Sequence, residues 1–135
     1  QGYSSAASDV YKRQYYNNSK GGVVVQIKYL EQDKLLFFSL EEEIDHHTTK
    51  DLRRKMDYEI ERHMPKKVIF NFDSVSFMDS AGIGLLLGRY KIVNMLGGEV
   101  ALINVKKSVK KVLDMCGILK LIHIYDDLDM KFNVC

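Results

Sequence analysis

A serine at the predicted start of a helix is the residue of this sequence whose setting most suggests chemistry. Ser80 follows Asp79 and precedes Gly82 and Gly84 within one helical stretch. The partial positive charge of a helix N-terminus favours a phosphate, so phosphorylation of Ser80 is physically plausible. Ser and Asp are also common N-cap residues, so capping alone would explain Ser80 equally well. The spacing leaves both interpretations open.

The glycines of this helix need an explanation of their own. Gly82, Gly84 and Gly88 all lie inside the predicted helix. Each costs about 1 kcal/mol relative to alanine in a helix interior, so something requires a small surface there. Tight packing against a sheet would account for them, and so would the close approach of another protein or a nucleotide.

The sequence contains no complete motif for a metal site, a serine hydrolase or a Walker loop. His46 and His47 are adjacent, so their side chains diverge on a helix, and no third ligand is spaced to join them. A serine-hydrolase elbow needs glycine two residues before its serine, where this chain has Met78 before Ser80. The glycine-rich stretch lacks the Gly-Lys-Ser/Thr of a Walker loop. We therefore expect no enzyme activity, no metal and no cofactor.

A nucleotide-binding or receiver-like α/β protein is the alternative from another class. It would use the loop from Asp73 to Ser80 for phosphate. A receiver also needs an acidic pair at the end of its first strand to hold magnesium, and Tyr29-Leu30-Glu31 does not supply one. A bound nucleotide or an acid-labile phosphate would favour this alternative.

The elements that position Ser80 are predicted from apolar periodicity. Three helices are indicated, ending at Pro65, before Gly97-Gly98 and near Gly117, and a helical turn is expected over 126–132. Arg89 and Lys91 are expected on the exposed side of the second helix, and Cys116 on the buried stripe of the third. Apolar runs with the length of strands span residues 23–30, 34–40, 68–72, 100–105 and 121–125. This order predicts a single α/β domain with a mixed β-sheet flanked by α-helices.

Composition limits the class of partner. The chain has 135 residues, enough for one domain, and 46% of them are hydrophobic. The formal net charge of +2 lies entirely in the first 22 residues, whereas nucleic-acid binders normally carry a broad basic patch. No apolar run approaches the roughly 18 residues that span a bilayer. We expect a cytoplasmic protein with no direct nucleic-acid contact and no membrane contact.

Residues 1–22 are expected to lie outside the fold. They are rich in Ser, Tyr, Asn and Gly, and they show no sustained apolar period. The stretch from Ser4 to Gln14 resembles translated adapter sequence, which would make it an artefact. The prediction is a flexible or artefactual tail over 1–22, with the domain over 23–135.

A resemblance sharpens these expectations. The string FMDSAGIGLLLGRYK (77–91) resembles the phosphorylation loop and following helix of the anti-sigma factor antagonists, which are STAS domains, and most closely of those that act in sporulation. The likeness extends in order to EIDHHT (43–48), GGE (97–99) and VKKVLDMCGILKLI (109–122), and covers residues 23–126. It implies a STAS-type fold that agrees with the periodicity.

The resemblance implies a partner-switching function. In the family, the serine that aligns with Ser80 is phosphorylated by an ADP- or ATP-binding protein that is both serine kinase and anti-sigma factor, and a serine phosphatase restores it. The unphosphorylated antagonist binds that kinase and so releases a sigma factor. The partner-binding residues expected here are Asp45, Asp79, Ser80, Ala81, Gly82 and Gly84.

The sequence departs from the family pattern at two positions. Relatives often carry a second serine where this chain has Ala81, so Ser80 is the only hydroxyl in the motif. Glu42 replaces a glycine that usually precedes the EIDHHT string, which alters an acidic turn. Within the family, a general-stress antagonist that acts on a different sigma factor is the alternative.

Overall fold

The fold is a single sheet with helices packed on it. The computed structural model describes residues 11–17, 23–40 and 49–125. The strands are β1 Tyr11–Asn17, β2 Val23–Leu30, β3 Leu35–Leu40, β4 Lys67–Asn71, β5 Glu99–Ile103 and β6 His123–Tyr125. The helices are α2 Thr49–His63, α3 Ser80–Met95, α4 Lys107–Met115 and the short 3₁₀ helix η1 Ile118–Lys120.

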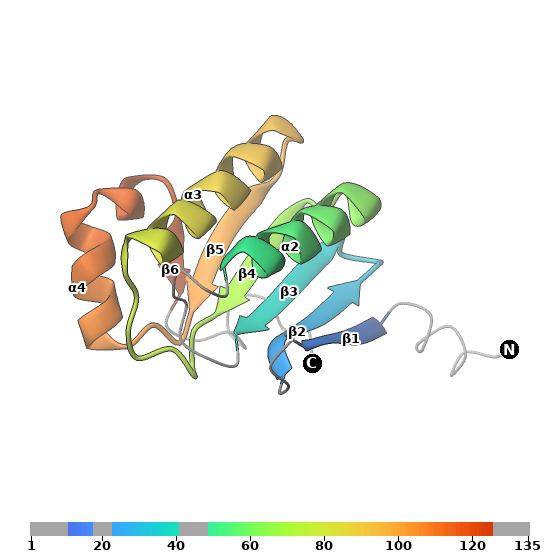
Figure 1. Cartoon of the computed structure of the whole chain (residues 1–135). Coiled ribbons are helices and arrows are strands. Elements are labelled where there is room, and N and C mark those ends of the chain that lie inside the picture. Colours follow the sequence, from blue (N-terminus) through green and yellow to red (C-terminus); the bar gives the residue numbers. More distant parts are fainter. Residues whose placement is uncertain (1–10, 18–22, 41–48, 126–135) are drawn as a thin grey trace, which may run out of the picture.

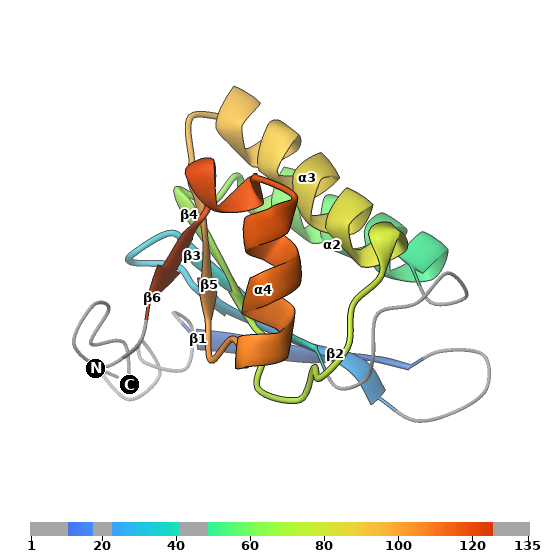
Figure 2. The same cartoon turned by 90° about the vertical axis from the view of Figure 1, so that its left-hand side faces the viewer.

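The six strands follow one another across the sheet in sequence order. The pairs β1–β2 and β2–β3 are antiparallel, and the pairs from β3 to β6 are parallel. Successive crossovers of one hand, each moving one strand in the same direction, put their helices on the same face. Figures 1 and 2 show α2, α3 and α4 on one face of the sheet. The predicted α/β class with a mixed sheet is confirmed.

Apolar side chains alternate between two clusters along the parallel strands. Val68 and Phe70 of β4 belong to the cluster that includes the buried residues of the helices, and the rings of Phe70 and Phe38 stack with centroids 5.4 Å apart. Ile69 belongs to a second cluster with Phe37 and others. Successive strand residues point to opposite faces, so the continuous apolar run of β4 reflects burial of the sheet on both faces.

The structure differs from the sequence-based expectations at residues 11–17 and at Cys116. Residues 11–17 form strand β1, paired with β2, and not a flexible tail. Three tyrosines among its seven residues favour a strand, and its polar composition suits a sheet edge. Cys116 is exposed, because α4 ends at Met115 and Cys116 follows as its C-cap. The remainder of the predicted tail and the predicted helical turn over 126–132 lie outside the described residues.

We propose that residues 23–135 nevertheless form the domain, and a chain beginning at Gly22 tests this. It is expected to fold cooperatively with a midpoint lowered by no more than about 4 °C, because an edge strand is lost while both described core clusters, whose first residues are Val25 and Leu30, are kept. Thermal unfolding followed by circular dichroism measures the change. Loss of the cooperative transition would make β1 part of the essential fold.

Candidate functional site

Ser80 lies on the surface at the end of the loop that joins β4 to α3. Val75 and Met78, with 0% and 3% of their surface exposed, anchor the loop in the core. The Val75 N–H donates to the carbonyl of Phe72 at 2.9 Å and closes a turn at the start of the loop. Phe77 is 58% exposed between these anchors. The alternation of buried and exposed residues ends with Ser80, an exposed residue that opens α3.

The start of α4 fixes the shape of this loop from the other side. The Ser108 hydroxyl donates to the carbonyl of Ser76 at 3.2 Å, and the Lys106 ammonium donates to the carbonyl of Asp73. Both bonds join residues more than 30 positions apart in the chain. The backbone leading to Ser80 is therefore held by tertiary contacts.

Asp79, and not Ser80, caps α3. Its Oδ1 accepts hydrogen bonds from the N–H of Ala81 at 3.0 Å and from the N–H of Gly82 at 3.3 Å. The cap satisfies N–H groups that have no partner within the helix. Capping therefore does not explain Ser80, which is the first residue of the helix proper.

The glycines of α3 divide into two kinds. Gly82 is buried, so its contribution is to the packing of the helix. Gly84 is exposed one turn after Ser80, and a Cβ built on it meets no described atom within 4 Å. The same holds for Gly88. Packing inside the described part of the domain therefore requires neither of these two glycines, in contrast to Gly98, whose Cβ would lie 2.9 Å from a backbone oxygen.

A cavity of about 300 Å³ lies beside Gly84, between the first turns of α2 and α3. Arg53 is its cationic side chain, and Arg53 makes no hydrogen bond or ion pair with any residue that the structure describes. The lining residues are Thr49, Arg53, Ala81, Gly84 and Leu85. Sequence patterns gave no signal for Thr49 or Arg53, because they come from a different helix.

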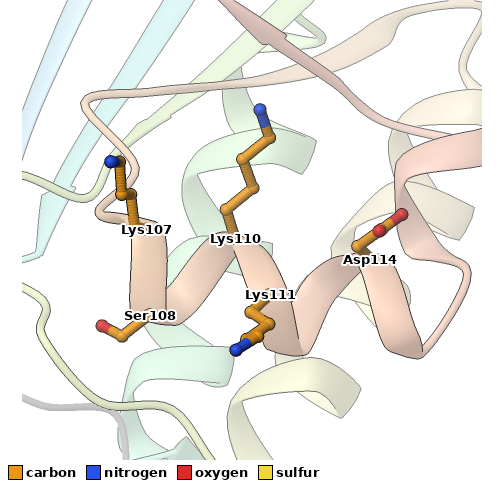
Figure 3. Close-up of a pocket in the computed structure, with 5 residues that line it drawn as sticks. All are labelled: Lys107, Ser108, Lys110, Lys111 and Asp114. Atoms are coloured by element: carbon orange, nitrogen blue, oxygen red, sulfur yellow. The ribbon is translucent and has the colours of Figure 1, made fainter.

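A basic cluster borders the same loop on α4. A pocket of about 410 Å³ lies on this helix. Figure 3 shows the side chains that line it, three of which are lysines. The lining residues are Lys107, Ser108, Lys110, Lys111 and Asp114. Because Ser108 is bonded to the loop, the cluster lies next to the backbone that leads to Ser80. The described face around α3 and α4 thus combines small, aromatic and basic residues.

Arg89 is buried, which corrects its predicted exposure. Only 4% of its surface is exposed, and its Nε lies 2.7 Å from Oδ1 of Asp57 in α2. Its Nη1 also donates to the carbonyl of Leu85 at 3.3 Å. Burial raises the pKa of the Asp57 carboxyl and lowers the pKa of the Arg89 guanidinium, while each partner's charge opposes those shifts. The pair joins α2 to α3.

Arg89→Met is expected to lower the free energy of unfolding by about 2 kcal/mol, because the half-buried Asp57 carboxylate loses its cation. Urea unfolding measures the loss. Arg54→Met, at an exposed position whose side chain makes no hydrogen bond or ion pair with any described residue, should change it by less than about 0.5 kcal/mol. Adding Asp57→Leu to Arg89→Met should restore most of the loss. An Arg89→Met chain as stable as the Arg54→Met chain would contradict this account.

The remaining predicted site residues lie outside the described part of the chain. These are Asp45 of the partner-binding set and the His46-His47 pair. Among the residues that are described, no group of three or more His, Cys, Asp or Glu side chains is arranged to hold a metal. None of the described helices has both the length and the apolar character needed to cross a bilayer.

Comparison with known proteins agrees with the fold. The STAS domain family matches residues 26–130. The anti-sigma F factor antagonist of Paenibacillus polymyxa is 39% identical over 103 residues, which cover 76% of this chain and 88% of that protein. The anti-sigma-B factor antagonist of Staphylococcus aureus is 24% identical over 100 residues, covering 74% and 92%.

Solved structures show the same likeness. The anti-sigma factor antagonist SpoIIAA in its unphosphorylated form superposes with a TM-score of 0.67 and 27% identity, over 82% of this chain and 98% of that one. The Bacillus cell fate determinant SpoIIAA in its phosphorylated form superposes with a TM-score of 0.63 and 27% identity, over 82% and 99%. The resemblance predicted from the sequence strings is confirmed.

Proposed function

This chain belongs to the STAS domain family, and we infer that it is an anti-sigma factor antagonist that acts by binding and not by catalysis. The observation that carries this inference is the exposed Ser80 at the start of α3, one turn before an exposed glycine whose side-chain space is empty. A relative with 39% identity is an anti-sigma F factor antagonist. The partner of this chain is accordingly an anti-sigma factor.

The surface around Ser80 suits close contact with that partner. A Cβ at Gly84 or Gly88 would meet no described atom within 4 Å, and each glycine costs about 1 kcal/mol that packing within the described domain does not offset. Contacts with a partner that approaches the helix closely would offset this cost. Phe77 adds an exposed aromatic side chain, the residue type that commonly dominates binding energy in interfaces. We propose Phe77, Ser80, Ala81 and Gly84 as contact residues, with Asp79 holding the helix start in place.

Phosphorylation of Ser80 is the proposed switch. A phosphoserine adds roughly −1.5 to −2 charges and three acceptor oxygens, and a closely packed partner surface cannot desolvate them easily. The unphosphorylated chain binds the anti-sigma factor, which then releases its sigma factor, and the phosphorylated chain dissociates. The kinase is the ADP- or ATP-binding anti-sigma factor itself, a serine phosphatase resets the switch, and the cycle takes place in the cytoplasm.

The sporulation branch of the family is favoured over the general-stress branch. Identity is 39% with an anti-sigma F factor antagonist and 24% with an anti-sigma-B factor antagonist over similar lengths. We therefore propose that the sigma factor released is of the sporulation type. Binding assays with one anti-sigma factor of each type would separate the two branches.

Peptide mapping after incubation with the cognate kinase and ATP is expected to find phosphate on Ser80 alone. Ser74 and Ser76 are also exposed, but they lie in the loop, whereas Ser80 lies on the proposed contact surface. Ser80→Ala should remove all incorporation, and Ser74→Ala should leave it unchanged. Phosphate mainly on Ser74, Ser76 or an aspartate would contradict the assignment.

A further inference from the structure

We propose that Arg53 binds the phosphate of phosphorylated Ser80 and draws it into the cavity between α2 and α3. This role depends on the phosphorylation of Ser80 that is proposed as the function. Arg53 lies outside the phosphorylation loop, on α2, and belongs to none of the sequence motifs described above.

The start of α3 is already occupied by a carboxylate. Oδ1 of Asp79 accepts from the N–H groups of Ala81 and Gly82, which are the donors that would otherwise face an anion. A phosphate on Ser80 would therefore lie next to a negative charge. Two N–H groups of the helix N-terminus already donate to the Asp79 carboxylate. Like charges at this separation repel, so the phosphate gains from any cation within reach.

Arg53 is the cation placed to meet it. Its side chain lines the cavity together with Ala81, the residue after Ser80, and Gly84, which lies one turn after Ser80. The acidic residue one turn further along α2 is Asp57, which feels the charge of Arg53 but is paired with Arg89, whose Nε lies 2.7 Å from its Oδ1. Arg53 itself is exposed and forms no hydrogen bond or ion pair with a described residue. Its guanidinium is thus available for the two-pronged contact that arginine makes with phosphate.

Gly84 leaves the space in which the two groups would meet. It lies one turn after Ser80 on the exposed side of α3, and the position of its missing Cβ is empty. A phosphate held there by Arg53 occupies the same surface that the partner needs to approach. Phosphorylation then blocks binding in two ways, by adding charge and by filling the contact surface.

The test uses the full chain with phosphoserine incorporated at position 80 during translation, so no kinase is needed. Thermal midpoints are measured with and without the phosphate in the unsubstituted chain, in Arg53→Gln and in Arg54→Gln. Arg54 is the adjacent exposed arginine and does not line the cavity, which makes it the matched control. Phosphate is expected to raise the midpoint by about 3 °C in the unsubstituted chain and in Arg54→Gln, and to give no rise in Arg53→Gln.

A second readout follows the arginine directly. The Nε–H signal of Arg53 in a nitrogen-proton NMR spectrum should shift and become protected from exchange when Ser80 carries phosphate. Equal midpoint shifts in the two arginine variants, or an unmoved Arg53 signal, would each overturn the role. Failure of the proposed function would show separately, as a kinase that leaves Ser80 unmodified.

Discussion

Ser80→Asp is expected to bind the anti-sigma factor about thirtyfold more weakly than the unsubstituted chain, whereas Ser80→Ala should bind with unchanged affinity. Aspartate places one negative charge on a surface that the partner must desolvate, and a cost of about 2 kcal/mol corresponds to that factor. Alanine removes only an exposed hydroxyl that does not cap the helix. Ser80→Ala should therefore hold the anti-sigma factor permanently and keep the sigma factor free.

Titration calorimetry against the ADP-loaded anti-sigma factor measures both affinities. Circular dichroism is the folding control, and both variants should unfold near the midpoint of the unsubstituted chain because position 80 is exposed. Equal affinities for the Ala and Asp variants would mean that charge at this position does not regulate binding.

Substitutions at Gly84 are expected to move stability and binding in opposite directions. Gly84→Ala should stabilise the fold by about 1 kcal/mol, because alanine favours the helix and its Cβ meets no described atom within 4 Å. The same methyl group would stand between the helix and its partner and should weaken binding about tenfold. The longer side chain of Gly84→Gln should weaken it about a hundredfold.

Asn94→Ala provides the matched control for this pair of effects. Asn94 is exposed near the end of the same helix, so alanine there improves helix propensity away from Ser80. It should raise stability and leave binding unchanged, as measured by urea unfolding and by calorimetry. A Gly84→Gln chain that binds as tightly as the unsubstituted chain would place the partner elsewhere on the molecule.

The periodicity of the sequence was sufficient to predict most of the fold. The predicted strand over 68–72 and helix after Ser80 correspond to β4 and α3, because a short apolar run and a spacing of three to four residues report local burial directly. The break at Pro65 and the left-handed Gly117, with φ 76°, mark where α2 and α4 give way to the next element. These signals are local, so one chain is enough to reveal them.

Features that depend on a distant partner could not be predicted in this way. Arg89 was expected on the surface, yet it lies four residues after Leu85 on the buried side of α3, where Asp57 pairs with it from 32 positions away. The cap was ambiguous between Asp79 and Ser80 until the side-chain bonds placed it on Asp79. The sequence likewise did not indicate which glycines of α3 face the core, as Gly82 does, and which face outward, as Gly84 does.

The affinity of the phosphorylated chain for the anti-sigma factor shows whether Ser80 is a switch. The chain is phosphorylated on Ser80, and its dissociation constant for the ADP-loaded anti-sigma factor is compared with that of the unphosphorylated chain by calorimetry. The phosphorylated chain is expected to bind about a hundredfold more weakly, a difference of about 3 kcal/mol, with an unchanged circular dichroism spectrum. Equal dissociation constants for the two forms would contradict it and leave Ser80 without a role in switching.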